Sequence, residues 1–137
     1  MEHNNSCYTS FSIKGMFNPD DITRILGLTP IKQWYIGDLR RNGTAYEFAF
    51  WEYGRCNEYN VITEYQMMYT IRDLMPKIEL LNKIKREFDV TLLLAVVPTV
   101  YVGEATPSLS PNRKIMEFCY KTETDFDIDL YVYDSIK

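Results

Sequence analysis

Apolar side chains recur at helical spacing through residues 61–89 of this 137-residue chain. Neighbouring members of the series are three or four positions apart, which places them on one side of an α-helix. No other stretch has so long a series, so we expect this helix to be the main cover of a β-sheet. The series consists of Met67, Ile71, Leu74, Ile78, Leu81, Ile84 and Phe88.

Pro76 lies in the middle of this series. Proline removes one helical hydrogen bond and clashes with the preceding turn, so it bends or divides a helix. Because the apolar series keeps its phase on both sides of Pro76, we expect one long bent helix rather than two independent ones. Thr63 and Gln66 have the spacing of a capping box, which predicts the start of the helix.

Other segments have the alternation or the β-branched composition of strands. Asn42-Gly43 between two of them favours a β-hairpin. The strand before residue 103 is apolar on both faces, which is typical of a central strand, and Pro98 indicates weaker pairing near its end. The predicted strands span residues 8–15, 33–40, 44–53, 90–102 and 126–133.

Two shorter helices begin at a capping residue followed by proline, at Asn18-Pro19 and at Ser110-Pro111. Gly27 ends the first of them. The order of elements is therefore βαββαβ followed by αβ, and the first six match a ferredoxin-like arrangement. The sequence thus predicts an α+β fold in which a mixed, mostly antiparallel five-stranded sheet carries the long bent helix on one face.

Length and composition limit the class of protein. The chain is predicted to be a single domain, residues 1–137, with residues 1–6 as a flexible polar tail. Its net charge of −4 argues against nucleic acid or an anionic membrane as the main partner. Three dispersed cysteines indicate free thiols in a reducing cytoplasm, and no signal peptide is visible. His3, the only histidine, lies in the tail, which excludes a histidine-dependent triad.

The last predicted strand alternates between apolar residues at even positions and polar or acidic residues at odd positions. We expect the even positions to lie in the core and the odd ones to meet water. Asp125, Asp127 and Asp129 then share one face at intervals of about 7 Å. Such oxygens suit Mg²⁺ or Ca²⁺, or a carboxylate-based hydrolase, but a flat row does not converge on one point. We interpret the row as an exposed acidic face, which would favour a basic partner, and predict no metal and no cofactor.

A family resemblance is carried by the first short helix and its flanks, together with Gly37-Asp38, Leu109-Ser110 and the segment 127–131. Over about residues 8–133 the chain resembles a widespread bacterial family of uncharacterised domains of unknown function. The resemblance implies a small cytoplasmic α+β protein, with some members at loci reminiscent of toxin immunity or mobile elements. It brings no catalytic residue to this chain. The main matching residues are Phe17-Asn18-Pro19-x-x-Ile22-Thr23-x-x-Leu26-Gly27-Leu28-x-Pro30.

Aromatic and basic residues are the remaining candidates for a functional surface, because the chain has 11 Tyr, 7 Phe and 2 Trp. Tyr, Trp and Arg dominate protein interfaces, although some of these side chains are also suited to the edge of the core. The candidate partner-binding residues are Arg40, Arg41, Trp51, Tyr53, Arg55 and Tyr59.

The favoured interpretation is a small, non-catalytic protein-binding module, such as an immunity or inhibitor protein that neutralises or regulates a partner. A mobile-element or phage-encoded inhibitor of a host defence protein is one version of it. The alternatives are a carboxylate-based hydrolase or a small-ligand sensor that uses the face of Asp127 and Asp129. A homodimer that pairs through the last strand is left open.

Overall fold

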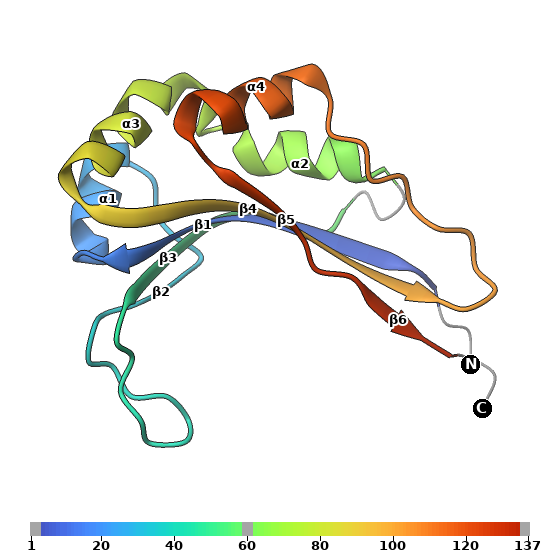
Figure 1. Cartoon of the computed structure of the whole chain (residues 1–137), viewed down its shortest axis with the longest axis horizontal. Coiled ribbons are helices and arrows are strands. Elements are labelled where there is room, and N and C mark those ends of the chain that lie inside the picture. Colours follow the sequence, from blue (N-terminus) through green and yellow to red (C-terminus); the bar gives the residue numbers. More distant parts are fainter. Residues whose placement is uncertain (1–3, 59–61, 135–137) are drawn as a thin grey trace.

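The computed structural model describes residues 4–58 and 62–134, which form four α-helices, one 3₁₀ turn and six strands (Figure 1). The elements are β1 (Ser6–Met16), α1 (Pro19–Leu26), β2 (Lys32–Trp34), β3 (Ala49–Cys56), α2 (Thr63–Ile71), η1 (Met75–Lys77), α3 (Ile78–Glu87), β4 (Asp89–Tyr101), α4 (Arg113–Thr122), β5 (Asp125–Ile128) and β6 (Tyr131–Tyr133). The fold class is α+β, as predicted.

The sheet is mixed and mostly antiparallel. Its order is β2-β3-β1-β4, with antiparallel pairing throughout, and β5 and β6 both pair in parallel with the remaining edge of β4. Helices α2, α3 and α4 lie over one face of this sheet, and α1 packs at its end (Figure 1). The strand predicted over residues 126–133 is divided into β5 and β6, which gives six strands rather than five.

Pro98 explains this division. Ile128 is paired with Val96 and Tyr131 with Thr99, so Pro98 of β4 falls opposite Leu130, in the gap between β5 and β6. A proline nitrogen has no hydrogen to donate into the ladder. The weaker pairing that the sequence predicts near Pro98 is therefore confirmed.

Residues 62–89 contain two separate α-helices, so the prediction of one bent helix over residues 61–89 is wrong. Helix α2 ends at Ile71, η1 contains Pro76, and α3 begins at Ile78. Pro76 cannot donate the hydrogen bond that would continue α2, and tighter bonds such as Lys77 N–H to the Leu74 carbonyl (2.9 Å) take over. The buried face is correctly predicted, because five members of the apolar series are fully buried: Met67, Ile71, Leu74, Leu81 and Ile84.

The predicted capping box at the start of α2 is also wrong. Thr63 is the first helical residue, and its hydroxyl donates to the Ser108 carbonyl. The Gln66 amide is fully buried and donates to the carbonyls of Cys7 and Cys56, 3.1 Å away in the second case. Both side chains therefore connect α2 to other segments, and neither caps it.

The starts of the other helices differ in how well they were predicted. Asn18 caps α1, as expected, and its side-chain oxygen accepts from the Asp20 N–H at 3.0 Å. Helix α4 begins later than Ser110-Pro111, because Asn112 is its cap and accepts from the Ile115 N–H at 2.9 Å.

The predicted flexible tail is shorter than residues 1–6. The side-chain oxygen of Asn5 accepts from the Tyr101 N–H at 2.7 Å, so residues 5–6 are not a tail. Residues 1–3 lie outside the described residues.

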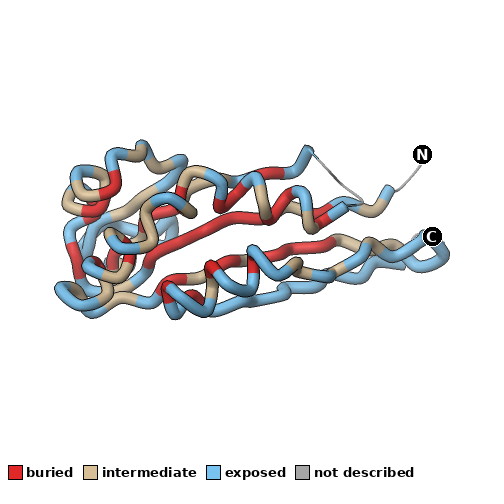
Figure 2. Tube along the Cα trace, turned by 90° about the horizontal axis from the view of Figure 1, so that it is seen from above, coloured by how far each residue is buried: buried red, intermediate tan, exposed pale blue. Residues whose placement is uncertain are grey.

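The core lies between the helices and the sheet. Phe11 and Ile13 of β1, Trp51 of β3 and Leu92 and Leu94 of β4 are fully buried against the apolar sides of the helices. Viewed from above, the buried residues follow the inner strands and the inner turns of the helices (Figure 2). Side chains that alternate with these core positions point away from the helices.

Residues 35–48 form a hairpin that projects from the sheet on the side opposite α2–α4 (Figure 1). The predicted strands 33–40 and 44–53 are too long, because regular pairing with β3 is limited to β2. The predicted turn is present: Gly43 has φ +86° and its N–H donates to the Arg40 carbonyl at 3.0 Å. A single bridge between Leu39 and Ala45 closes the hairpin.

Candidate functional site

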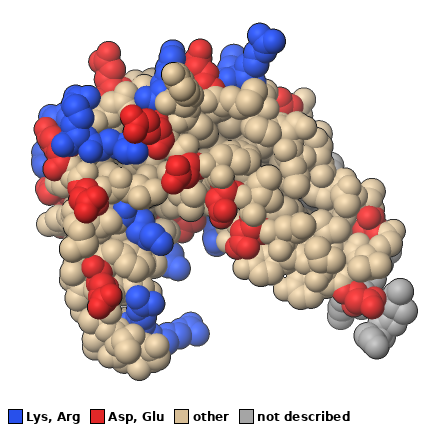
Figure 3. Space-filling model, in the orientation of Figure 1, with Lys and Arg blue, Asp and Glu red and all other residues tan. Residues whose placement is uncertain are grey.

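The face of the sheet opposite the helices is uncovered by any described segment (Figure 1). In the space-filling view it is a hollow between the projecting hairpin and the far end of the strands (Figure 3). We call this surface the open face. Strand alternation and pairing register assign to it Tyr8, Ser10, Ser12 and Lys14 of β1, Phe50 and Glu52 of β3, Leu93, Ala95 and Val97 of β4, and Asp125 and Asp127 of β5.

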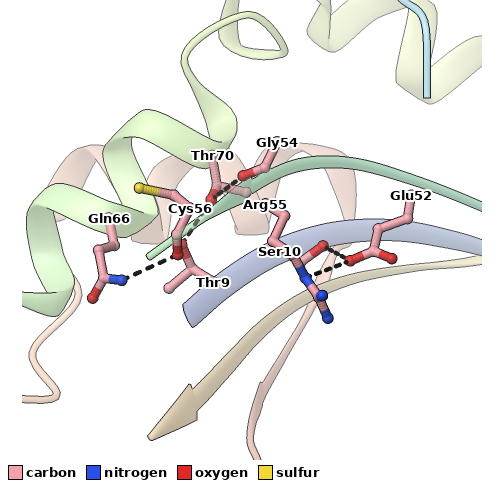
Figure 4. Close-up of polar contacts among 8 residues, drawn as sticks. All are labelled: Thr9, Ser10, Glu52, Gly54, Arg55, Cys56, Gln66 and Thr70. Atoms are coloured by element: carbon pink, nitrogen blue, oxygen red, sulfur yellow. Dashed lines mark hydrogen bonds and ion pairs between the residues drawn. The ribbon is translucent and has the colours of Figure 1, made fainter. Parts of the chain in front are cut away.

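A buried carboxylate lies in the middle of the open face. Glu52 is only 6% exposed, and the Ser10 hydroxyl donates to its Oε2 (Figure 4). Nε of Arg55 lies 3.6 Å from the same oxygen. The Arg55 guanidinium also covers the Tyr8 ring, 4.1 Å from its centroid. The charge of Glu52 is therefore compensated, which is what a buried carboxylate requires.

A β-bulge places Arg55 on this face. Pairing between β1 and β3 shifts between Thr9 and Phe11, so the extra residue on β3 falls at Gly54-Arg55. Gly54 has φ +74°, a conformation that favours glycine. On the helix side, the Thr70 hydroxyl donates to the Gly54 carbonyl at 2.6 Å and lies 2.7 Å from the Thr9 hydroxyl (Figure 4). Helix α2 thus fixes the bulge that directs Arg55 to the opposite face.

The projecting hairpin is held by a stack of aromatic rings. The Trp34 ring lies between those of Phe50 and Tyr46, with centroid distances of 4.4 and 4.0 Å. The Arg40 guanidinium covers the outer side of Tyr46 at 4.5 Å. Such stacked contacts, with cations on the ring faces, fix the hairpin relative to the sheet.

Exposed cations gather at the tip of this hairpin (Figure 3). Arg40 and Arg41 are both exposed there, as expected for two candidate partner-binding residues. The stack beneath them was not predicted, because it depends on pairing between two strands. The sequence contained only a partial signal for it, the alternation of Tyr46, Phe48 and Phe50.

Two of the three predicted acidic residues lie at the rim of the open face. Asp125 and Asp127 stand beside Leu93 and Ala95, and all of residues 125–134 are exposed. Asp129 follows β5 and accepts from the Tyr131 hydroxyl at 3.1 Å. Within the described ranges, no group of three or more His, Cys, Asp or Glu side chains could hold a metal ion.

The even positions of this edge do not lie in the core, which corrects the prediction for the last strand. Phe126, Ile128, Leu130 and Val132 are 37–59% exposed. Phe126 and Ile128 lie beside Leu94 and Val96, so their side chains point to the helix side of the sheet. They stay exposed because β5 is the outermost strand and no described helix extends over it.

The prediction that Trp51 binds a partner is wrong, because Trp51 is a core residue. It is fully buried, and its Nε1–H donates to the Thr23 hydroxyl at 3.0 Å. Tyr53 is half-buried on the helix side, where it packs against the core and donates to Asp73 Oδ2 at 2.6 Å. Tyr59, like His3, lies outside the described residues. Arg40, Arg41 and Arg55 are therefore the predicted partner-binding residues that the open face and its hairpin present.

Two recesses lie away from the acidic strand. One of about 570 Å³ is lined by Asp20, Thr23 and Thr29 of the α1 region together with Lys32 and Gln33 of β2. Another of about 490 Å³ lies on α2, between Tyr65, Met68, Tyr69 and Arg72. Neither includes Asp127 or Asp129, so neither supports the hydrolase or sensor alternative on that strand.

The Tyr53–Asp73 pair gives the fold a predicted pH dependence. Burial and the bond to Asp73 raise the pKa of Tyr53 to about 12. The same bond lowers the pKa of Asp73 below its ordinary value of 3.8. Because the pKa of Tyr53 is higher in the folded protein than its value of 10 in the unfolded chain, Tyr53 adds stability that is fully present below pH 10. This stability is lost as the pH rises towards 12. Because the pKa of Asp73 is lower in the folded protein than its value of 3.8 in the unfolded chain, Asp73 adds stability that is fully present above pH 3.8. This stability is lost as the pH falls through the lowered pKa.

Tyr53→Phe is therefore expected to make the urea midpoint less dependent on pH at both extremes. The matched control is Tyr120→Phe on α4, because Tyr120 is 83% exposed. Equal pH profiles for the Tyr53 variant and the unmodified protein would show that the pair does not act in this way.

Comparison with known proteins identifies the family. The model of the family described as domain of unknown function (DUF4279) matches residues 5–133, and the chain belongs to this family. The resemblance noted from the sequence, to an uncharacterised domain family, is thereby confirmed. No curated protein and no solved structure matches the chain. In the described part of the chain, no helix has the length and apolar content needed to cross a membrane.

Proposed function

We propose that this chain is a non-catalytic protein-binding module whose open face receives its partner. The observation that carries the proposal is the uncovered, hollowed face of the sheet beside a projecting hairpin (Figure 3). This face presents the partly exposed rings of Tyr8 and Phe50 beside the exposed Arg55. Aromatic and arginine side chains are enriched where proteins recognise one another. The small, partly exposed side chain of Ala95 lets a partner approach β4 closely.

The hairpin supports this proposal because it is preorganised. The stack of Arg40, Tyr46, Trp34 and Phe50 holds the hairpin before any partner arrives, so little ordering entropy is lost on binding. The tip carries cations, whereas Asp125 and Asp127 line the opposite rim. A partner with an acidic patch against the tip would be oriented by these charges.

An immunity or inhibitor protein that neutralises or regulates its partner is the most specific form of the proposal, and a mobile-element or phage-encoded inhibitor is one version of it. A cytoplasmic location belongs to the same proposal. It is supported by Cys7, Cys56 and Cys119, which are all free thiols.

The test is photocrosslinking in native lysate, with a photoreactive amino acid at Ala95 on the open face or at Glu79 on the exposed side of α3. The expected result is one protein that crosslinks from position 95, is competed by excess unmodified chain, and is not captured from position 79. Equal capture from both positions, or none from position 95, would contradict the proposal.

Arg40→Ala combined with Arg41→Ala is expected to weaken binding of the captured partner by about tenfold or more, because arginines at an interface carry a large share of the binding energy. The control is Lys83→Ala with Arg86→Ala, which removes the same charge from exposed positions on α3. Isothermal calorimetry with the purified partner measures both. Equal affinities for the two double variants would place the partner elsewhere.

A further inference from the structure

No described strand pairs with the outer edge of β5 and β6, and the positions of the backbone groups along this edge follow from the ladder with β4. The Asp129 N–H donates to the Val96 carbonyl, and the Tyr133 carbonyl accepts from the Val102 N–H, both at 2.9 Å. In a parallel ladder the two backbone groups of one residue point to the same side, and neighbouring residues alternate. Odd-numbered residues therefore bond to β4. The even-numbered residues, Phe126, Ile128, Leu130 and Val132, direct their N–H and C=O groups outwards.

The same even-numbered residues carry the exposed apolar side chains of this edge. None of them belongs to the hydrophobic core or to the partly buried side chains that pack against it. The segment is exposed from residue 125 to residue 134 (Figure 2). A long apolar edge of this kind is a template for another strand unless something covers it.

Charge indicates which strand would fit. Residues 117–134 contain six acids and one base, Lys121, whose ammonium lies 3.8 Å from Glu117. No described Lys or Arg forms an ion pair with Asp125 or Asp127, which alternate with the apolar residues along β5. A second copy of this chain would add its own acids to the edge, whereas a basic strand would neutralise them.

We propose that the free edge of β5 and β6 binds an extended segment of a partner protein in which basic and apolar residues alternate. The partner's backbone bonds to the outward groups of the even-numbered residues. Its apolar side chains extend the row of Phe126 and Ile128, and its Lys or Arg side chains meet Asp125 and Asp127. This site shares only Asp125 and Asp127 with the rim of the open face and does not include the hairpin tip. Its failure would therefore leave the proposed function intact.

The test uses a fluorescent synthetic peptide in which lysine and valine alternate, and a control peptide of the same composition with all lysines before all valines. Anisotropy is expected to show that the alternating peptide binds much more tightly. Asp125→Asn with Asp127→Asn should weaken its binding about fivefold, since each cross-strand charge pair contributes modestly. The charge-matched control, Glu79→Gln with Glu87→Gln on α3, should leave the affinity unchanged.

Ile128→Pro tests the backbone part of the proposal, because it removes one outward N–H and no bond to β4. It should weaken the alternating peptide by more than about tenfold. Should this variant not fold, amide exchange of the unmodified protein decides: peptide must slow exchange at Ile128 and Leu130. Equal binding of both peptides, unchanged exchange, or a stable dimer with these amides already protected would overturn the proposal.

Discussion

Gly54→Ala is expected to lower the free energy of unfolding by about 3 kcal/mol, through strain in the bulge and a clash with α2. A Cβ at this position would lie 2.5 Å from the Thr70 carbonyl oxygen and 3.1 Å from its Cα. Both are backbone atoms, so no rotation of a side chain relieves the contact. The positive φ of +74° adds strain for any residue with a Cβ.

Gly103→Ala is the matched control for this prediction. Gly103 has φ +96°, but a Cβ there would meet nothing within 4 Å. Its cost is therefore limited to backbone strain, about 1 kcal/mol. Urea unfolding followed by circular dichroism measures both variants. If the two lose the same stability, close approach of α2 to the bulge is not what requires glycine at position 54.

The bulge also shows what local sequence patterns do not contain. Cap and stop residues such as Asn18 and Gly27 act within one turn, so their roles were predictable from spacing alone. The extra residue at Gly54-Arg55 depends on how β3 registers against β1 and on α2 above it. Its consequence, an arginine on the face opposite Tyr53, therefore had no signal in the alternation of β3.

The same limit applies to burial along strands. Alternation correctly separated the two faces of residues 125–133, but it did not tell whether a helix covers either one. Phe126 and Ile128 were expected in the core and are exposed, because β5 is the last strand of the sheet. Trp51 was assigned to a surface and is buried, because β3 lies inside the sheet under α1 and α2.

The candidate site was predictable only in part, for a related reason. Arg40 and Arg41 were located by the Asn42-Gly43 turn signal, which is local. The open face exists because α2, α3 and α4 all pack on one side of the sheet (Figure 1). Which side of a sheet its helices choose depends on the whole topology, so no single segment of the sequence reveals the uncovered face.

The two tryptophans provide the second large expected effect, because one belongs to the core and the other to the projecting hairpin. Trp51→Ala should lower the free energy of unfolding by about 4 kcal/mol. The indole is fully buried, stacks on Tyr53 with centroids 5.8 Å apart, and donates to Thr23. Its removal leaves a large cavity between α1 and β3 and an unpartnered hydroxyl on α1.

Trp34→Ala deletes the same atoms from the hairpin stack and is expected to cost about 1–2 kcal/mol. The main effect of Trp34→Ala should be a more mobile hairpin, because Tyr46 loses the ring that connects it to Phe50. Amide exchange at Gly37 and Tyr46, whose N–H groups bond across the hairpin at 2.8 Å, should become faster while exchange in β1 and β4 stays slow. If the Trp34 variant is as unstable as the Trp51 variant, the hairpin belongs to the cooperative core. The preorganised hairpin that the proposed function requires could then not be separated from folding.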